Sequence, residues 1–534
     1  PDVAPAEAAA APSRARVAKR VSDIVVTVTS PLGEEDDERL PDVGDSVKFS
    51  SGAIGHVVAL SDLCFAAALS NPEDQVAEGE GYVILSKSLR PMVAVPEAGG
   101  GAVDARGRPL GGEEGASPGV DEGRKVAWFN EIVGLVRRQR IDAPLHAGVM
   151  GLDAFVPIGR GQSMLLRLPA GVDQSRLAEF LAHVVAAQAG NDVRSVAAFG
   201  TEADARQLQG LVAGSEASGR LTVVAGRSES SRPGETVLAM NAACALAEAH
   251  RDAGGDALLL LDLEPLYRVW AVLAEVSAEE GLVEQANRDQ NKEIEKLPEE
   301  LGVELWRYVA RRNAVTARRR TFLGCFLQRA GRMAEDRGGG SLTLLAFARL
   351  KDDSKLSRLE LEAKLRSVRQ MKLDEAVRRK ALDKIEAQLA QLPEDGGGAG
   401  VPDDFIEEAK AVTDGHVVFT DAAAGADGRP RWCVDIHESV ARGITADSVQ
   451  SRPLHVLRSL NLKMHLMQEE EGSSEAIVDL DGLGQAGVHL ERDPLLALLQ
   501  QPVGDVLSVE DEAALLLLAL DDAALAAEAR PLAE

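Results

Sequence analysis

The segment PLHAGVMGLDAFVPIGRGQSMLLRLPAGVDQS, residues 144–175, carries the clearest structural pattern of this chain. A turn rich in Gly and Pro leads into the apolar run Met164–Leu166, a loop of small residues follows, and an amphipathic segment begins near Leu177. This order predicts a strand, a loop and a helix. Because backbone N–H groups at the start of a helix bind anions, a nucleotide-binding protein would place its phosphate loop here.

Length and composition predict several domains and exclude some functions. A chain of 534 residues is too long for one core and suggests roughly two to four domains. With 85 Asp and Glu against 58 Lys and Arg, general nucleic-acid binding is implausible. The cysteines have no ligand spacing with each other or with His, so we expect neither a disulfide framework nor a metal site. They are Cys64, Cys244, Cys325 and Cys433.

The segment that begins at Pro157 resembles PIGRGQRELIIGDRQTGKT of the alpha subunit of F-type ATP synthases. Aligned without gaps, Leu168 and Asp173 stand where the family has its two glycines, and Gln174 stands where it has its lysine. Ser175 keeps the hydroxyl type that would reach Mg²⁺. Glycines let the backbone wrap a phosphate and lysine supplies positive charge, so we expect this site to be degenerate and to hold no cofactor of its own.

Further segments follow the family's order along the chain. VKFSSGAIGHVVAL (47–60) resembles part of the N-terminal barrel, GGGSLT (338–343) resembles a segment that leads into a strand, and LSVEDE (507–512) resembles LSVEEQ of the C-terminal bundle. The resemblance implies an α/β protein with a small N-terminal β-barrel, a central RecA-like nucleotide-binding-type domain and a C-terminal helical bundle. Alternating apolar runs and helical segments over 124–276 independently predict a mostly parallel sheet covered on both faces.

The predicted parts are an N-terminal arm, a β-barrel domain, a loop, the α/β domain and a helical domain, at residues 1–22, 23–96, 97–123, 124–450 and 451–534. Two insertions depart from the family, at about 278–320 and 351–400. The first ends in a basic cluster, which we interpret as a solvated helix face or protein contact because the whole chain is acidic. The second is predicted to be a charged helical hairpin.

Two residues outside the loop are candidates for function. Asp262 ends an apolar strand, where open α/β sheets bind ligands, and the resemblance places it near Mg²⁺. Capping of the following helix is an equally good interpretation. Arg442 matches the arginine that an alpha subunit of this family lends to the neighbouring beta site, where it stabilises the transferring phosphoryl group. The alternative is a surface ion pair with Asp435 or Glu438.

The resemblance implies a non-catalytic alpha-like subunit in the head of a proton-translocating F-type ATP synthase, with no independent enzyme activity. Its partners would be beta-type subunits in an alternating hexamer, the central rotor shaft and the peripheral stalk, with ATP or ADP and Mg²⁺ at the beta site. We expect no nucleic-acid partner and membrane association only through the complex. The expected location is the matrix side of the mitochondrial inner membrane, or else the stromal side of the plastid thylakoid. The competing hypothesis is an alpha-like pseudo-subunit recruited as a scaffold in another organellar complex.

Overall fold

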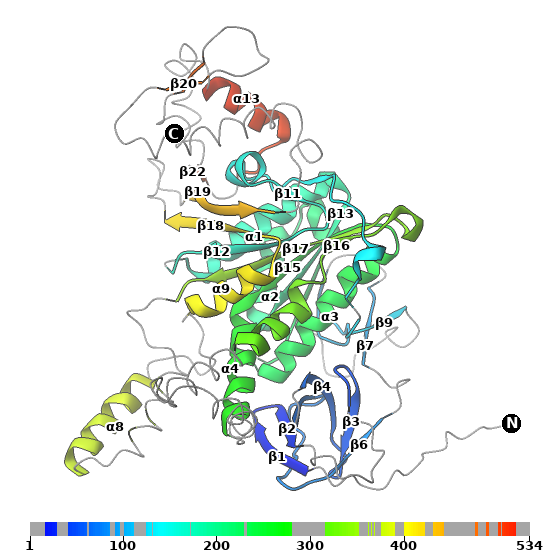
Figure 1. Cartoon of the computed structure of the whole chain (residues 1–534), viewed down its shortest axis with the longest axis vertical. Helices are drawn as coiled ribbons and strands as arrows, with labels where there is room; N and C mark the ends of the chain where they lie inside the picture. Colours follow the sequence, from blue (N-terminus) through cyan, green and yellow to red (C-terminus); the bar gives the residue numbers. More distant parts are fainter. Residues whose placement is uncertain are drawn as a thin grey trace, which may run out of the picture.

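The computed structural model shows a central α/β domain, a smaller all-β unit formed by the N-terminal strands, and an outlying helix (Figure 1). Helices cover both faces of the central sheet, and helix α8 (Glu375–Leu389) projects away from it. The structure describes residues 16–28, 41–60, 64–85, 91–96, 101–111, 124–130, 132–170, 172–228, 232–279, 316–351, 361, 365, 368, 375–389, 400–421, 431–442, 476–478, 488–490, 500–502 and 505–519.

The N-terminal unit is a six-stranded antiparallel sheet in the order β1-β2-β5-β4-β3-β6. Because successive side chains of a strand point to opposite faces, Val25 and Val47 pack into the unit's own core, while Ile24 and Val26 pack against the central domain. The strands are β1 (Arg16–Val21), β2 (Ile24–Val28), β3 (Ser46–Phe49), β4 (Ile54–Leu60), β5 (Cys64–Leu69) and β6 (Tyr82–Ile84).

Strand β1 corrects one predicted boundary. It lies within residues 1–22, which we predicted to be a loose arm, and it forms a hairpin with β2 through the two-residue turn Ser22-Asp23. Backbone hydrogen bonds between Val17 and residues 79–80 also join the edge strand β1 to the turn that precedes the other edge strand, β6. The sheet agrees with the short β-rich runs of the sequence, and a fully closed barrel stays a prediction.

The central sheet has ten strands, and the path β22-β19-β18-β12-β17-β15-β13-β14-β8 crosses it, with β16 paired to β17. All pairs between β18 and β8 along this path are parallel, as the alternating sequence pattern predicts. The strands are β8 (Gly101–Val103), β12 (Ser163–Leu168), β13 (Val193–Phe199), β14 (Leu221–Ala225), β15 (Asp256–Asp262), β16 (Gly331–Arg332), β17 (Ser341–Arg349), β18 (Gly415–Asp421), β19 (Arg431–Ala441) and β22 (Gln500–Pro502).

Two apolar clusters cover the two faces of this sheet. Leu166 of β12 packs with α1 (Gln174–Gln188) and α2 (Glu202–Val212), while its neighbour Leu165 belongs to the cluster on the other face. That second cluster is formed with α3 (Pro233–Asp252), α4 (Leu263–Glu279) and α9 (Asp403–Val412). Burial on both faces explains why the central strands read as continuous apolar runs. The predicted strand, loop and helix at 163–188 are therefore confirmed.

Two further predicted boundaries were wrong. The loop predicted at 97–123 contains β8, which extends the central sheet by pairing with β14. The region predicted to be helical, 451–534, contains the strand pair β20 (Ala476–Val478) and β21 (Val488–Leu490) and the strand β22 besides helix α13 (Val509–Ala519). Strand β22 pairs with β19, so it satisfies backbone groups that an edge strand would otherwise expose. Residues 451–475, which also belong to the region predicted to be helical, lie outside the described residues.

The described parts of both insertions are helical. Residues 316–327 form a helix whose Arg319 pairs with Asp404 at 2.7 Å and whose Arg320 pairs with Glu408, both on α9. This part of the basic cluster therefore makes contacts within the protein. Helix α8 belongs to the second insertion, as the charged helical pattern predicts. In the part of the chain that the structure describes, no helix is long and apolar enough to cross a bilayer.

Two short strand pairs complete the fold around the central domain. Strands β7 (Met92–Ala94) and β9 (Lys125–Ala127) form one antiparallel pair. Strands β10 (Pro144–Leu145) and β11 (Ile158–Gly159) form the other, and β11 leads directly into β12. The segment 144–175 thus begins as a small hairpin at the amino edge of the central sheet.

Candidate functional site

The loop between β12 and α1 is tied down by apolar side chains. Leu168, the last residue of β12, has no exposed surface, and its carbonyl oxygen accepts a hydrogen bond from the Leu350 N–H at 2.8 Å. Val172 is also buried and packs in the same core as α1. A loop that wraps a phosphate needs free backbone N–H groups and space without Cβ atoms. Here bulky side chains occupy the loop and anchor it in the core.

The first turn of α1 carries its own negative charge. Asp173 is the N-cap residue, and its Oδ1 accepts a hydrogen bond from the Arg176 N–H at 2.8 Å. This carboxylate occupies a donor that a bound phosphate would use, and it repels an anion. Gln174 is the first helical residue, and the Ser175 hydroxyl accepts a hydrogen bond from Gln207 of α2 at 3.0 Å. These residues do not fit a Mg²⁺-bound polyphosphate.

Asp262 lies at the carboxyl end of β15, as predicted, and is almost fully buried. Its Oδ1 accepts a hydrogen bond from the Glu264 N–H at 2.9 Å, so it caps α4. Burial, together with the nearby Glu264 carboxylate, raises the pKa of Asp262 to about 7. The capping interpretation is therefore the one that matches a contact in the structure.

Asp262 belongs to a group of five charged side chains at the carboxyl edge, which we call the crevice cluster. Glu264 pairs with Arg349 at 2.5 Å, and its other oxygen lies 4.0 Å from Arg268. Burial opposes the charge on Arg349, but Glu264 and Asp262 outweigh it and raise the pKa of Arg349. The members are Asp204, Asp262, Glu264, Arg268 and Arg349.

The crevice cluster contains three acidic and two basic residues. It therefore has no excess of positive charge that would bind a phosphate. Burial also raises the pKa of Asp204, which accepts a hydrogen bond from the Thr201 hydroxyl at 2.7 Å. Our sequence analysis named only Asp262 of these five. Arg349 ends β17 as Asp262 ends β15, so the same strand-end argument would have found it.

Arg442 lies at the opposite edge of the sheet. It follows the end of β19, its N–H donates to the Asp414 carbonyl oxygen at 3.0 Å, and its own carbonyl oxygen accepts from Gln162 at 2.8 Å. Asp414 in turn binds Ser163, the first residue of β12, at 2.8 Å. One six-residue strand, roughly 20 Å, therefore separates the backbone of Arg442 from the carboxyl edge. The structure does not bring the predicted site residues together.

The side chain of Arg442 is exposed. Glu438, one of the two carboxylates considered as its partner, pairs instead with Arg167 at 3.2 Å. Among the residues that the structure describes, we find no ion pair of the Arg442 guanidinium. A charged group held by its backbone and free at its tip is available to a neighbouring molecule.

The PIGRGQ motif has a structural role in this fold. Gly161 has a φ of +102°, its N–H donates to Thr343 at 2.9 Å, and a Cβ there would lie 2.7 Å from the backbone nitrogen of Arg332. Arg160 pairs with Asp256 of β15 at 2.5 Å. Gln162 accepts a hydrogen bond from the Gly159 N–H while it holds Arg442. The motif thus positions the amino ends of three strands and the residue that follows β19.

Comparison with known proteins gives a partial match. Residues 148–288 match the family described as "ATP synthase alpha/beta family, nucleotide-binding domain". ATP synthase subunit alpha of Hydrogenovibrio crunogenus is 26% identical over 226 residues, which cover 41% of this chain and 41% of that protein. The same subunit of Teredinibacter turnerae is 28% identical over 222 residues with the same coverage. That of Paracidovorax citrulli is 29% identical over 200 residues, covering 37% of this chain and 36% of its own length.

The chain is thus similar to ATP synthase alpha subunits over 41% of the length of the first two relatives. The matched region covers β12, the loop between β12 and α1, helix α1 and the elements that follow up to β15. Residues 148–288, which lie within the central α/β domain, therefore match a nucleotide-binding domain model of the ATP synthase alpha/beta family. This agrees with the resemblance on which the predicted α/β domain rests. The matched family region ends before Arg442.

Proposed function

We propose that this chain is an alpha-like subunit in the catalytic head of a proton-translocating F-type ATP synthase. In this proposal its own nucleotide site is degenerate, and Arg442 acts in the site of a neighbouring beta-type subunit. The observation that carries the proposal is the contrast between the two edges of the sheet. The loop at one edge is closed by Asp173 and Leu168, while Arg442 at the other is exposed and held by its backbone.

The chemistry of this contrast suits a helper subunit. A guanidinium offers a rigid, always-charged fork that matches phosphate oxygens and stabilises the charge of a transferring phosphoryl group. Such arginines contribute about 10³–10⁵ in rate where they have been dissected. The neighbouring beta-type subunit would supply the phosphate loop and the Mg²⁺-nucleotide. The other proposed partners are the rotor shaft and the peripheral stalk. The proposed location is the matrix side of the mitochondrial inner membrane, with the plastid as the alternative.

The test is reconstitution of the chain with a beta-type subunit that has an intact phosphate loop, together with the rotor subunit. We expect Arg442→Ala to leave assembly and nucleotide affinity nearly unchanged and to lower steady-state ATP turnover by about 10³ or more. Arg442→Lys is expected to rescue little, because a point charge cannot reproduce the fork. Arg379→Ala, at an exposed position of α8, is the matched control and should turn over normally. Normal turnover with alanine at 442 would contradict the proposal.

A scaffold role in another organellar complex is the second candidate. Two features support this role: Asp173 caps the loop between β12 and α1, and the crevice cluster has no excess of positive charge. A scaffold subunit would need no nucleotide site of its own. The two functions differ in what copurifies with the native chain. A beta-type partner with an intact phosphate loop supports the first function, and a complex without one supports the second.

A further inference from the structure

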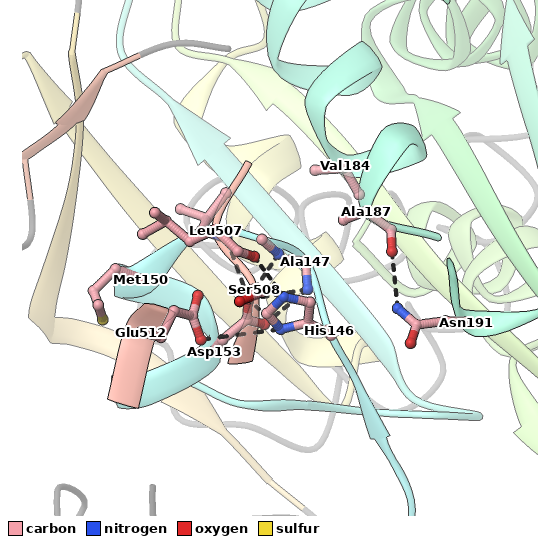
Figure 2. A network of polar contacts seen from close by, with 12 residues as sticks. His146, Ala147, Met150, Asp153, Val184, Ala187, Asn191, Leu507, Ser508 and Glu512 are labelled. Atoms are coloured by element: carbon pink, nitrogen blue, oxygen red, sulfur yellow. Dashed lines mark hydrogen bonds and ion pairs between the residues drawn. The ribbon is translucent and has the colours of Figure 1, made fainter. Parts of the chain in front are cut away.

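A buried polar cluster joins the C-terminal helix to the central domain (Figure 2). His146 follows β10, Asp153 lies in the π-helical turn Gly151–Phe155, and Glu512 lies in α13. One nitrogen or oxygen atom from each side chain lies within 4.8 Å of those of the other two. Figure 2 shows the three side chains pointing toward one another across segments far apart in the sequence. We call this group the tail cluster.

Hydrogen bonds orient the side chains of the tail cluster toward one another. The Asp153 carboxylate accepts four hydrogen bonds from the backbone N–H groups of residues 147–149, at 2.7–3.2 Å. His146 Nε2 lies 2.8 Å from the carbonyl oxygen of Leu507, so we assign a ring hydrogen to Nε2. His146 Nδ1 lies 3.1 Å from Asp153 Oδ2, and although burial opposes the charged ring, the hydrogen bond and the charge of Asp153 raise the pKa of His146. The position between Nδ1 and Oδ2 therefore holds a proton, or a metal ion in place of that proton.

Glu512 adds a second carboxylate to the tail cluster. Its side chain has no exposed surface, and neither of its oxygens has a hydrogen-bond partner in the described part of the chain. The nearest basic atom is His146 Nδ1, 4.0 Å from Oε2, which is too long for a hydrogen bond. Burial and the charge of Asp153 raise the pKa of Glu512. A buried carboxylate without a partner is costly, so a cation at this place would be bound favourably.

We propose that His146 Nδ1, Asp153 and Glu512 bind one divalent transition-metal ion of the Zn²⁺ type, which fastens α13 to the central domain. An imidazole nitrogen with two carboxylate oxygens is a Zn²⁺-type ligand set, whereas Mg²⁺ and Ca²⁺ prefer oxygen ligands alone. The supporting contacts also fit: Nε2–H donates to the Leu507 carbonyl oxygen, and the backbone orients Asp153. This site is separate from the nucleotide-type loop and from Arg442, and it goes beyond the proposed function.

The ion would have a structural role. The two carboxylates are buried and His146 is half-buried. The ligands come from the end of a hairpin, a helical turn and a helix near the end of the described chain. In the motif that LSVEDE resembles, the position of Glu512 carries a neutral Gln, so Glu512→Gln is the natural variant to remove the third ligand. It keeps the size and shape of the side chain and loses only the charge.

The experiment uses the full-length, tag-free chain after treatment with a chelator, and the probe is Zn²⁺ alone. By equilibrium dialysis we expect one equivalent to bind. We also expect Zn²⁺ to raise Tm with the logarithm of its free concentration above Kd and to slow hydrogen exchange in α13. Co²⁺ in place of Zn²⁺ should give a visible absorption band. Glu512→Gln is expected to weaken binding at least about 100-fold and to abolish the Zn²⁺-dependent change in Tm.

Glu510→Gln is the matched control, because Glu510 is exposed in the first turn of the same helix. It should bind Zn²⁺ as the unaltered chain does. His146→Ala provides a second variant that should also lose the ion. The proposal is overturned if the unaltered chain binds no stoichiometric Zn²⁺, or if Glu512→Gln binds it equally well. A third outcome also overturns it: the unaltered chain takes up no metal, and Glu512→Gln raises Tm. In that case Glu512 shares a proton with Asp153, and a neutral amide replaces this carboxyl group favourably.

Discussion

Leu168, Asp173 and Gln174 decide what the loop before α1 can bind. A leucine at the end of the strand anchors the loop in the core, an aspartate caps the helix, and a glutamine stands where a cation would be needed. Each change removes a different requirement for phosphate binding: space, free donors and positive charge. Because residues 148–288 match a nucleotide-binding domain model, we expect these three side chains to decide whether the loop binds a nucleotide.

We therefore predict that the isolated chain shows no saturable, Mg²⁺-dependent ATP binding. The physical reason is that Asp173 both repels phosphate and occupies the donor of Arg176. Titration calorimetry with ATP, with and without Mg²⁺, checks this at millimolar nucleotide. A nucleotide whose phosphates are coordinated next to Ser175 would show that the loop is functional after all. Adenine held by apolar contacts alone would not.

His56 predicts a pH dependence of stability in the N-terminal sheet. It is 6% exposed, and its ring lies between Ser46, at 3.0 Å from Nδ1, and Ser70, at 2.7 Å from Nε2. Two hydroxyl groups satisfy a neutral imidazole, which needs one donor and one acceptor. Burial disfavours the cation and Arg106 repels it, so the pKa of His56 is lowered to about 4.

The sign follows from proton binding in the two states. Above pH 6.5 both states are neutral at this residue, and between pH 6.5 and 4 only the unfolded chain takes up a proton, so stability falls as pH falls. The loss at pH 5 is about 2 kcal/mol. Urea unfolding at pH 7 and pH 5 measures it, with His56→Gln as the control that keeps polar contacts but cannot titrate. Equal pH dependence in both proteins would rule out His56 as the cause.

At the scale of elements, helix α8 and helix α9 differ in how much apolar surface they bury. The side chains described on α8 are half-buried or exposed, and the helix projects away from the sheet (Figure 1). Helix α9 buries Phe405 and Ile406 against the α3 face of the sheet. Burial of apolar area, not helix propensity, decides which helix the domain needs.

Replacing residues 370–395 by a short Gly-Ser linker should therefore leave the α/β domain folded. The deletion spares Leu361, which is 3% exposed. Circular dichroism melts should show cooperative unfolding with a Tm within a few degrees of the full chain. Deletion of 403–412 is the contrasting control and should abolish that transition, because it removes buried apolar surface. Loss of cooperative unfolding in the first variant would mean that α8 belongs to the core.

At the scale of the whole molecule, the two edges of the central sheet face different surroundings. The closed loop and the crevice cluster lie at the carboxyl ends of the parallel strands, and Arg442 follows a strand at their amino ends. The ring proposed above would place these two edges at different subunit interfaces, because a head-to-tail contact joins two different surfaces of neighbouring subunits. Because Arg442 contributes no ion pair among the described residues, Arg442→Ala should also leave the Tm of the isolated chain unchanged.

From the sequence alone, the α/β class and the strand, loop and helix at 163–188 could be predicted. Local periodicity suffices for these, because each depends on neighbours in the chain. The resemblance to ATP synthase alpha subunits named Arg442, Gln174 and Ser175 as candidates, and the position at a strand end also pointed to Asp262. Their roles in function stay predictions.

Only the tertiary structure decided which distant residues meet. It paired Asp262 with the first turn of α4, gathered Arg349 and Glu264 at the same edge, and brought Glu512 against His146 and Asp153. It also made a strand of residues 16–21 and another of 101–103, where composition indicated loops. The physical reason is that pairing across a sheet and burial between elements depend on contacts between residues far apart in the chain, which periodicity does not encode.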